Sequence, residues 1–154
     1  MSGSHETRQT DLHGRDERCT VCEDRSLIEA FVDSCEDAIL TKAPDGVITT
    51  WNRGAERLFG YAAEDVIGKP VVVLVPPDRI TEELEILGLA MAGKSISGLE
   101  SELCRADGTV VVVSLTVSPV RDFADNVVSV SVIARDITLR RRYLRRLRRL
   151  LELR

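Results

Sequence analysis

The chain has 154 residues, a net charge of −4, 44% hydrophobic and 30% charged residues, a composition that fits one folded domain rather than a disordered chain. Only 4% of the residues are aromatic, which argues against the base-stacking surfaces of single-strand nucleic-acid binders. The longest apolar run, Val71 to Val75, is too short to cross a bilayer, and the polar N-terminus lacks a signal-peptide core. We therefore expect a soluble, cytoplasmic protein whose four cysteines are reduced.

Residues 1–24 are rich in charged residues, serine and threonine, and they show no apolar periodicity, which predicts a flexible leader. The leader contains Cys19 and Cys22 in a Cys-x-x-Cys motif, with His13 upstream. A structural zinc site needs four ligands, and a thioredoxin-like pair would follow a strand. We therefore favour an uncommitted thiol pair and predict no metal site.

An amphipathic helix is predicted for residues 26–36, with Ser26 as its N-cap and Glu29 at the capping-box position. Its apolar residues Leu27, Ile28 and Phe31 are candidates for contacts in a homodimer. This helix leads into the folded domain, which we expect to span residues 25–138.

A β-hairpin follows, with strands at 38–42 and 47–51 around the turn Pro44-Asp45-Gly46. Asn52 is the predicted N-cap of a short helix at 53–58, and Gly60 is expected to end that helix in the left-handed region. A further helical turn is expected at 64–66.

One long helix is predicted from Asp78 or Thr81 to about Ala92. Its apolar stripe, made of Ile80, Leu84, Leu87 and Met91, would pack on a sheet or roof a ligand cavity.

Three strands come next, at 97–105, 109–120 and 127–137. In the middle strand Val111, Val113, Leu115 and Val117 alternate with polar residues, which is typical of an antiparallel strand with one buried face. The element order predicts an α+β fold, in which a five-stranded antiparallel sheet carries helices on one face. Cys35 and Cys104 are expected to be buried structural thiols.

The region from Leu27 to Thr138 resembles the PAS sensory domain family through several short motifs that occur in the same order and spacing. These motifs are Asp37-Ala38-Ile39, Asp45 to Ile48, Trp51 to Tyr61, Glu64 to Lys69, Asp107-Gly108, Ser118-Pro119-Val120 and Arg135 to Thr138. The resemblance implies the PAS fold and a sensory and dimerisation role. It also implies that Asp136, Ile137 and Thr138 couple the last strand to a signalling helix, with Asp136 or Thr138 as its cap.

The resemblance leaves the ligand open. Haem-binding members usually supply a histidine from the long helix, and flavin-binding photoreceptors carry an Asn-Cys-Arg-Phe motif; residues 78–92 and 69–74 contain neither. The cofactor is therefore unknown, and the pocket would hold a small apolar molecule, such as a fatty acyl chain, or nothing. The candidate lining residues are Ile39, Ile48, Leu58, Val66, Leu74, Ile80, Leu84, Leu87, Met91, Leu103, Val113, Leu115, Val117, Val130 and Val132.

Residues 139–154 form a basic amphipathic segment with eight arginines and one glutamate. Leu144, Leu147 and Leu151, with Ile137 seven residues before Leu144, have the three-four spacing of a coiled-coil seam. The resemblance implies the start of a dimer stalk that continues into an output domain such as a histidine kinase, so the chain is a fragment or a stand-alone sensor. Binding to an anionic membrane surface or to nucleic acid is a less favoured alternative.

The sequence thus predicts a sensory and dimerisation module of a signal-transduction protein, with an output domain or other protein as its partner. The alternative is a ligand-free interaction module. We expect no enzymatic activity, because the folded part contains no Ser/His/Asp set, phosphate loop or paired acid with a histidine.

Overall fold

The computed structural model describes the backbone of residues 17–153 and the side chains of residues 25–153. The predictions for His13, Cys19 and Cys22 lie outside the described side chains. The chain divides into two compact units, Met1–Phe31 and Val32–Arg154, and each is described by itself.

The first helix, α1, spans Glu17–Ser34, so it begins well before the predicted start at Ser26. Residues 17–24, which were predicted to belong to the leader, are helical in this structure. No proline or glycine interrupts the sequence from Glu17 to Ser34, and Arg25 and Glu29 form an ion pair one turn apart. The prediction rested on the spacing of apolar residues, and this signal cannot detect residues 17–25, which are helical but mostly polar.

The remaining elements follow the predicted order. The strands are β1 (Ala38–Lys42), β2 (Ile48–Trp51), β3 (Ile96–Cys104), β4 (Val110–Arg121) and β5 (Val127–Asp136). The helices are α2 (Arg53–Phe59), α3 (Ala63–Val66), α4 (Ile80–Met91) and α5 (Thr138–Glu152), with short 3₁₀ helices η1 (Val71–Leu74) and η2 (Pro77–Arg79) before α4. No helix in the described part of the chain is both long and apolar enough to cross a membrane.

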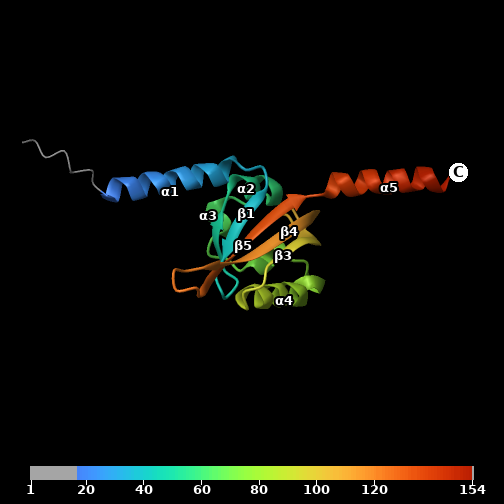
Figure 1. Cartoon of the computed structure of the whole chain (residues 1–154). Coiled ribbons are helices and arrows are strands. Elements are labelled where there is room, and N and C mark those ends of the chain that lie inside the picture. The colour runs from blue at the N-terminus through green and yellow to red at the C-terminus, as the bar shows by residue number, and fades with distance from the viewer. Residues whose placement is uncertain (1–16, 154) are drawn as a thin grey trace, which may run out of the picture. The chain divides into compact units, whose positions relative to one another are not determined.

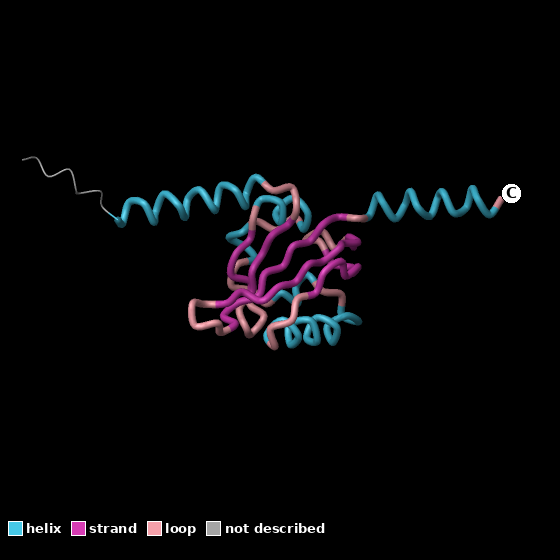
Figure 2. The backbone as a smooth tube through the Cα atoms, viewed as in Figure 1, coloured by secondary structure: helices cyan, strands magenta, loops and turns pink. Residues whose placement is uncertain are grey.

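All five strands form one antiparallel sheet in the order β2-β1-β5-β4-β3. The last strand, β5, is therefore the central strand, between β1 and β4, as Figures 1 and 2 show. The long helix α4 packs against β4 and β5. The α+β class and the five-stranded antiparallel sheet are confirmed.

Alternating side chains divide the sheet into a buried and a more exposed face. On β4, Val111, Val113, Leu115 and Val117 are buried, as predicted. On β5 the buried series is Val130, Val132 and Ala134. The core lies between this face and the helical segments.

The turns use the predicted residues. Asn52 caps α2 by accepting a hydrogen bond from the backbone N–H of Ala55, and Gly60 ends the helix with a φ of 77°. In the β3–β4 turn, the hydroxyl and the backbone N–H of Thr109 both donate to Asp107. These bonds lower the pKa of Asp107 below its ordinary value because they stabilise the carboxylate.

Candidate functional site

A cavity lies on the buried face of the sheet. Its volume is about 20 Å³, enough for one water-sized molecule. The lining comes from β1, β3, β4, β5, α2, α4 and the segment 71–75, as follows: Leu40, Lys42, Phe59, Val71, Leu74, Val75, Glu83, Leu103, Leu115, Val117, Val132 and Ala134.

Strand register builds the floor of the cavity. Val132 on β5 pairs with Leu40 on β1 and with Val117 on β4, so these three side chains form a row across the sheet. Ala134 pairs with Leu115 in the next row on the same face. The central strand therefore contributes two adjacent lining residues and contacts both neighbouring strands.

The opposite wall contains Phe59, the last residue of α2, and side chains from η1 and its end. Phe59 is fully buried, and its ring centroid lies 5.5 Å from that of Trp51. The indole N–H of Trp51 donates to the backbone carbonyl of Tyr61, 3.0 Å away, which fixes the indole beside Phe59.

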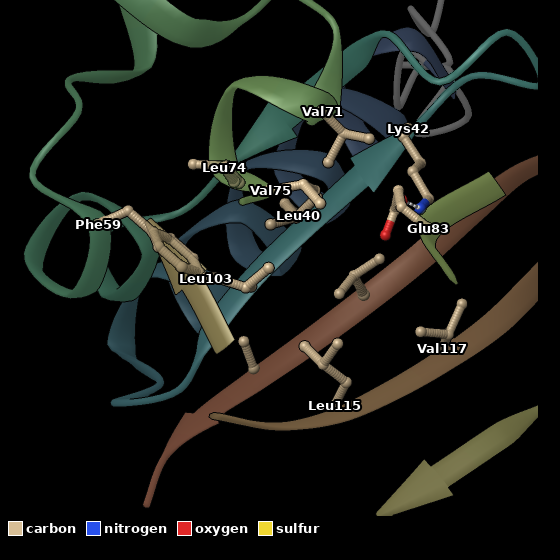
Figure 3. Close-up of a pocket in the computed structure, with 12 residues that line it drawn as sticks. Leu40, Lys42, Phe59, Val71, Leu74, Val75, Glu83, Leu103, Leu115 and Val117 are labelled. Carbon is tan, nitrogen blue, oxygen red and sulfur yellow. Dashed lines mark hydrogen bonds and ion pairs between the residues drawn. The ribbon is translucent and has the colours of Figure 1, made fainter. Parts of the chain in front are cut away.

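Two charged side chains interrupt the apolar lining. Lys42 Nζ, at the end of β1, pairs with Glu83 Oε1 on α4. The Lys42 side chain is only 1% exposed and that of Glu83 12%. Figure 3 shows the two side chains pointing toward one another at one end of the lining, with Phe59 and Leu103 at the other.

The structure places the predicted lining residues in three groups. Leu74, Leu103, Leu115, Val117 and Val132 line the cavity. A second group belongs to the core or packs against it without lining the cavity: Ile48, Leu58, Val66, Leu87, Met91, Val113 and Val130.

The third group contains wrong predictions. Ile39 alternates with the buried Ala38 and Leu40, so it lies on the other face of the sheet and is only half-buried. On α4, Ile80 is exposed and Leu84 is 59% exposed, because Ile86 and Ala90 are the buried residues. The wrong faces of β1 and α4 were chosen for the same reason. Lys42 on β1 and Glu83 on α4 are charged, so they were read as solvent-facing, whereas both side chains lie on the buried side of their element.

Sequence reasoning missed Leu40, Lys42, Phe59, Val71, Val75, Glu83 and Ala134 as lining residues. The charged pair was the hardest to find, because its members are 41 positions apart and each reads as a solvent-exposed residue. One available signal was the alternation of Ala38, Leu40 and Lys42 on β1, which places Lys42 on the buried face once Ala38 and Leu40 are assigned inward.

The exit from β5 is held by hydrogen bonds to β4. The backbone N–H of Ile137 donates to the carbonyl of Val112 at 3.0 Å, and the backbone N–H of Val112 donates to the Thr138 hydroxyl at 3.3 Å. Asp136 Oδ1 accepts from the backbone N–H of Thr138 at 2.9 Å, so Asp136 satisfies the first amide of α5. The N-cap position of α5 is Ile137, which has no side-chain capping bond, so neither Asp136 nor Thr138 is the cap that was predicted. Asp136 instead binds the amide of Thr138 two residues on, and Thr138 bonds to the sheet.

Ion pairs surround the same exit. Arg135 binds Asp37 through two nitrogens, at 3.1 and 3.3 Å, and these hydrogen bonds, followed by the charge of Asp37, raise the pKa of Arg135. Arg105 lies 3.7 Å from Asp136, and Arg141 in the first turn of α5 binds Glu100 on β3 at 2.6 Å. The start of α5 is therefore tied to β3, to the β3–β4 turn and to β4.

The helical residues predicted to pair in a dimer are exposed. Leu144, Leu147 and Leu151 are exposed on α5, and so are Leu27, Ile28 and Phe31 in the first unit. Ile137 differs, because it is 7% exposed and belongs to the domain. The predicted seam therefore cannot include Ile137 and would begin at Leu144.

The sequence matches the family described as the PAS fold over residues 26–137, which is most of the chain. The chain belongs to the PAS family. A crystallised PAS domain from Colwellia psychrerythraea has a TM-score of 0.66 and 29% identity, covering 77% of this chain and 98% of that one. The PAS fold predicted from the sequence is confirmed.

Relatives of this PAS domain occur within much longer proteins. A phytochrome of Picea abies is 29% identical over 134 residues, which is 84% of this chain and 12% of the relative. Two-component system protein A of Emericella nidulans is 35% identical over 114 residues, 72% of this chain and 16% of the relative. The chain thus spans a small part of each, and both relatives support a sensory signalling module.

The dimensions of this PAS cavity limit what it holds in the described conformation. A volume of about 20 Å³ is far too small for a haem or a flavin. Among the described residues there is no group of three or more histidine, cysteine, aspartate or glutamate side chains arranged to hold a metal ion. Cys35 and Cys104, predicted to be buried, are half-buried.

Proposed function

We propose that this PAS domain is a non-enzymatic sensory and dimerisation module of a cytoplasmic signal-transduction protein, in which the state of the cavity controls helix α5. One observation carries the proposal. Val132 and Ala134 line the cavity from the central strand, and that strand ends at Asp136, which binds the first amide of α5.

The coupling requires two conformations that bind the signal differently, because only differential affinity can shift a conformational equilibrium. A molecule entering the cavity would push the row formed by Leu40, Val132 and Val117. A displacement of β5 would strain the bonds of Ile137 and Thr138 to Val112, which hold the start of α5. The position of α5 would then report the state of the cavity.

The output would pass through paired copies of α5. Its exposed leucines Leu144, Leu147 and Leu151 have the spacing of a parallel seam, and arginines occupy most other positions. In the longer protein such a helix would continue into an output domain, for example a histidine kinase. The two-component relative supports this kind of output, and the apolar residues of α1 would add to the contact between copies.

Dimerisation is tested with matched serine variants of α5. Leu147→Ser should weaken the homodimer at least about tenfold, because it removes apolar area from both helices of the seam. Leu153→Ser changes an exposed leucine outside the seam and should leave the dissociation constant unchanged. Sedimentation equilibrium of the whole chain measures both constants. Equal dissociation constants for the two variants would show that the α5 seam is not part of the dimer interface.

A ligand-free interaction module is the second candidate, and the small volume of the cavity favours it. Native mass spectrometry of the whole chain discriminates between the two. A mass excess that disappears on denaturation supports the sensor, whereas a dimer of bare chains after incubation with candidate ligands supports the interaction module.

A further inference from the structure

Helix α5 carries most of its charged side chains on one face and its apolar side chains on the other. At about 3.6 residues per turn, arginines recur three and four positions apart on one side. These residues, which we call the arginine face, are Arg142, Arg145, Arg146 and Arg149, and all of them are exposed. The opposite side carries the apolar residues Leu139, Tyr143, Leu144, Leu147, Leu150 and Leu151. One face of α5 is therefore densely cationic.

The arginine face has no counter-charge among the described residues. Arg25 on α1 pairs with Glu29, and Arg141 at the start of α5 pairs with Glu100. No such ion pair reaches the arginine face from the described part of the chain. Its residues instead lie one turn apart as like charges, an arrangement that destabilises a helix. An anion bound to this face would remove that repulsion.

Pairing two copies of α5 through Leu144, Leu147 and Leu151 adds to the repulsion. Seven arginines and one glutamate give each helix a net charge of +6, and two helices a charge of +12. Paired helices lie only about 8–10 Å apart. The positions that flank the seam carry ion pairs in many coiled coils, but here they hold arginine, tyrosine and leucine and no acidic residue. A polyanion that neutralises both helices would therefore stabilise the pair.

We propose that the arginine face of α5 binds the phosphate backbone of duplex DNA without regard to base sequence, while the leucine seam remains free for pairing. Duplex DNA carries one negative charge per about 1.7 Å of its axis, and the arginine face extends for about 10 Å. The guanidinium group matches the geometry of a phosphate, which it can bind through two hydrogen bonds. Backbone contacts need no stacking on bases, so the low aromatic content does not oppose them.

An anionic membrane would use the opposite face of the helix. An amphipathic helix on a membrane surface buries its apolar side among the acyl chains. On α5 that side contains Leu144, Leu147 and Leu151, so membrane binding would compete with the dimer. DNA binds the arginine face and leaves these leucines in the seam. The choice of DNA thus rests on the proposed pairing of α5 and adds a partner to it.

The rest of the chain confines the contact to α5. Residues 139–154 have a charge of +7, from eight arginines and one glutamate, so residues 1–138 carry −11 of the total of −4. This acidic part repels DNA, whereas α5 leaves the sheet beyond the end of β5 (Figure 1). Substitutions on α5 alone should therefore be enough to test the proposal.

Fluorescence anisotropy of the whole chain with two labelled DNA duplexes of unrelated sequence tests the assignment. Both duplexes should bind with the same affinity. For four phosphate contacts, the logarithm of the association constant should fall with the logarithm of the salt concentration with a slope of about −4. Binding should therefore weaken roughly 100-fold between about 50 and about 200 mM salt.

Matched double variants locate the contact on α5. Arg145→Gln with Arg149→Gln should weaken binding at least about tenfold at about 100 mM salt and make the salt slope shallower by about 2, because two phosphate contacts are lost. Arg145→Lys with Arg149→Lys keeps both charges and should keep the slope. Arg53→Gln with Arg57→Gln makes the same change of charge, at the same spacing, on exposed residues of α2. This control should leave the slope unchanged.

Three outcomes would each overturn the assignment. The first is no binding of either duplex by the unmodified chain at about 50 mM salt, where phosphate contacts are strong. The second is an equal loss of binding in the α5 and α2 glutamine variants. The third concerns vesicles made of equal parts of phosphatidylglycerol and phosphatidylcholine. Half-saturation of the chain at a lower concentration of vesicle phosphate than of DNA phosphate would assign α5 to a membrane instead.

Failure of this assignment is distinguishable from failure of the proposed dimer. If Leu147→Ser and Leu153→Ser dimerise equally well, but the α5 glutamine variant loses DNA, the pairing is wrong and the arginine face still binds DNA. If Leu147→Ser weakens the dimer and the unmodified chain binds neither duplex, the pairing is supported and the DNA assignment is wrong.

Discussion

Asn52→Ala is expected to lower the free energy of unfolding by about 3–5 kcal/mol. The buried Asn52 side chain accepts hydrogen bonds from the backbone N–H groups of Ile39 and Ala55, both at 2.8 Å. It donates to the carbonyls of Val32 and Asp37 at 3.0 and 3.1 Å. Alanine would remove four bonds and leave backbone groups of three segments without partners. Urea denaturation followed by circular dichroism measures the loss.

Asn126→Ala is the matched control, because Asn126 is exposed in the β4–β5 turn. Its effect should remain within about 0.5 kcal/mol. A loss below about 1 kcal/mol for Asn52→Ala would mean that these four bonds do not hold α2 against β1 and the end of α1.

Phe59→Ala should also destabilise the domain by about 3–5 kcal/mol, because it deletes a fully buried ring in contact with Trp51 and enlarges an existing cavity. The size of the loss depends on how far α2 and the segment 71–75 can collapse onto the vacated space. The measurement is the free energy of unfolding from urea denaturation of the variant and of the unmodified chain.

Phe123→Ala provides the comparison, because Phe123 is fully exposed at the tip of the β4–β5 connection. Its removal should leave the free energy of unfolding almost unchanged. Similar losses for the two variants would show that Phe59 is not part of the packed wall of the cavity.

Most of the fold was predictable because its signals are local. Alternation on β4 identified Val111, Val113, Leu115 and Val117 as buried, and Asn52 and Gly60 marked the ends of α2. The start of α1 was not predictable in the same way. Residues 17–24 are helical without an apolar stripe, and only the absence of proline and glycine points to it.

The site was predictable only in part, because its distinguishing feature is a long-range pair. The strand residues Leu115 and Val117 followed from alternation. The face of α4 did not, since Glu83 lies inward and pairs with Lys42, and no local pattern links two residues that the fold alone brings together.

The segment that joins β5 to α5 was located correctly from the sequence, but its three residues have different contacts in the structure. Asp136 binds the first amide of α5, Thr138 bonds to Val112, and Ile137 is buried in the domain instead of contributing to a helical seam. The predicted seam counted seven residues from Ile137 to Leu144 as if both lay on one helix. Helix α5 begins only at Thr138, so the spacing does not apply to Ile137.

The central claim, that the cavity controls α5, is tested most directly by hydrogen–deuterium exchange of the first turns of α5 in Val75→Leu. Val75 lines the cavity outside the sheet, so a larger side chain there mimics occupancy without altering β5. Val73→Leu makes the same change at an exposed residue of the same segment. We predict changed exchange from Thr138 to Leu144 in Val75→Leu and none in Val73→Leu. Identical exchange in both folded variants would contradict the claim.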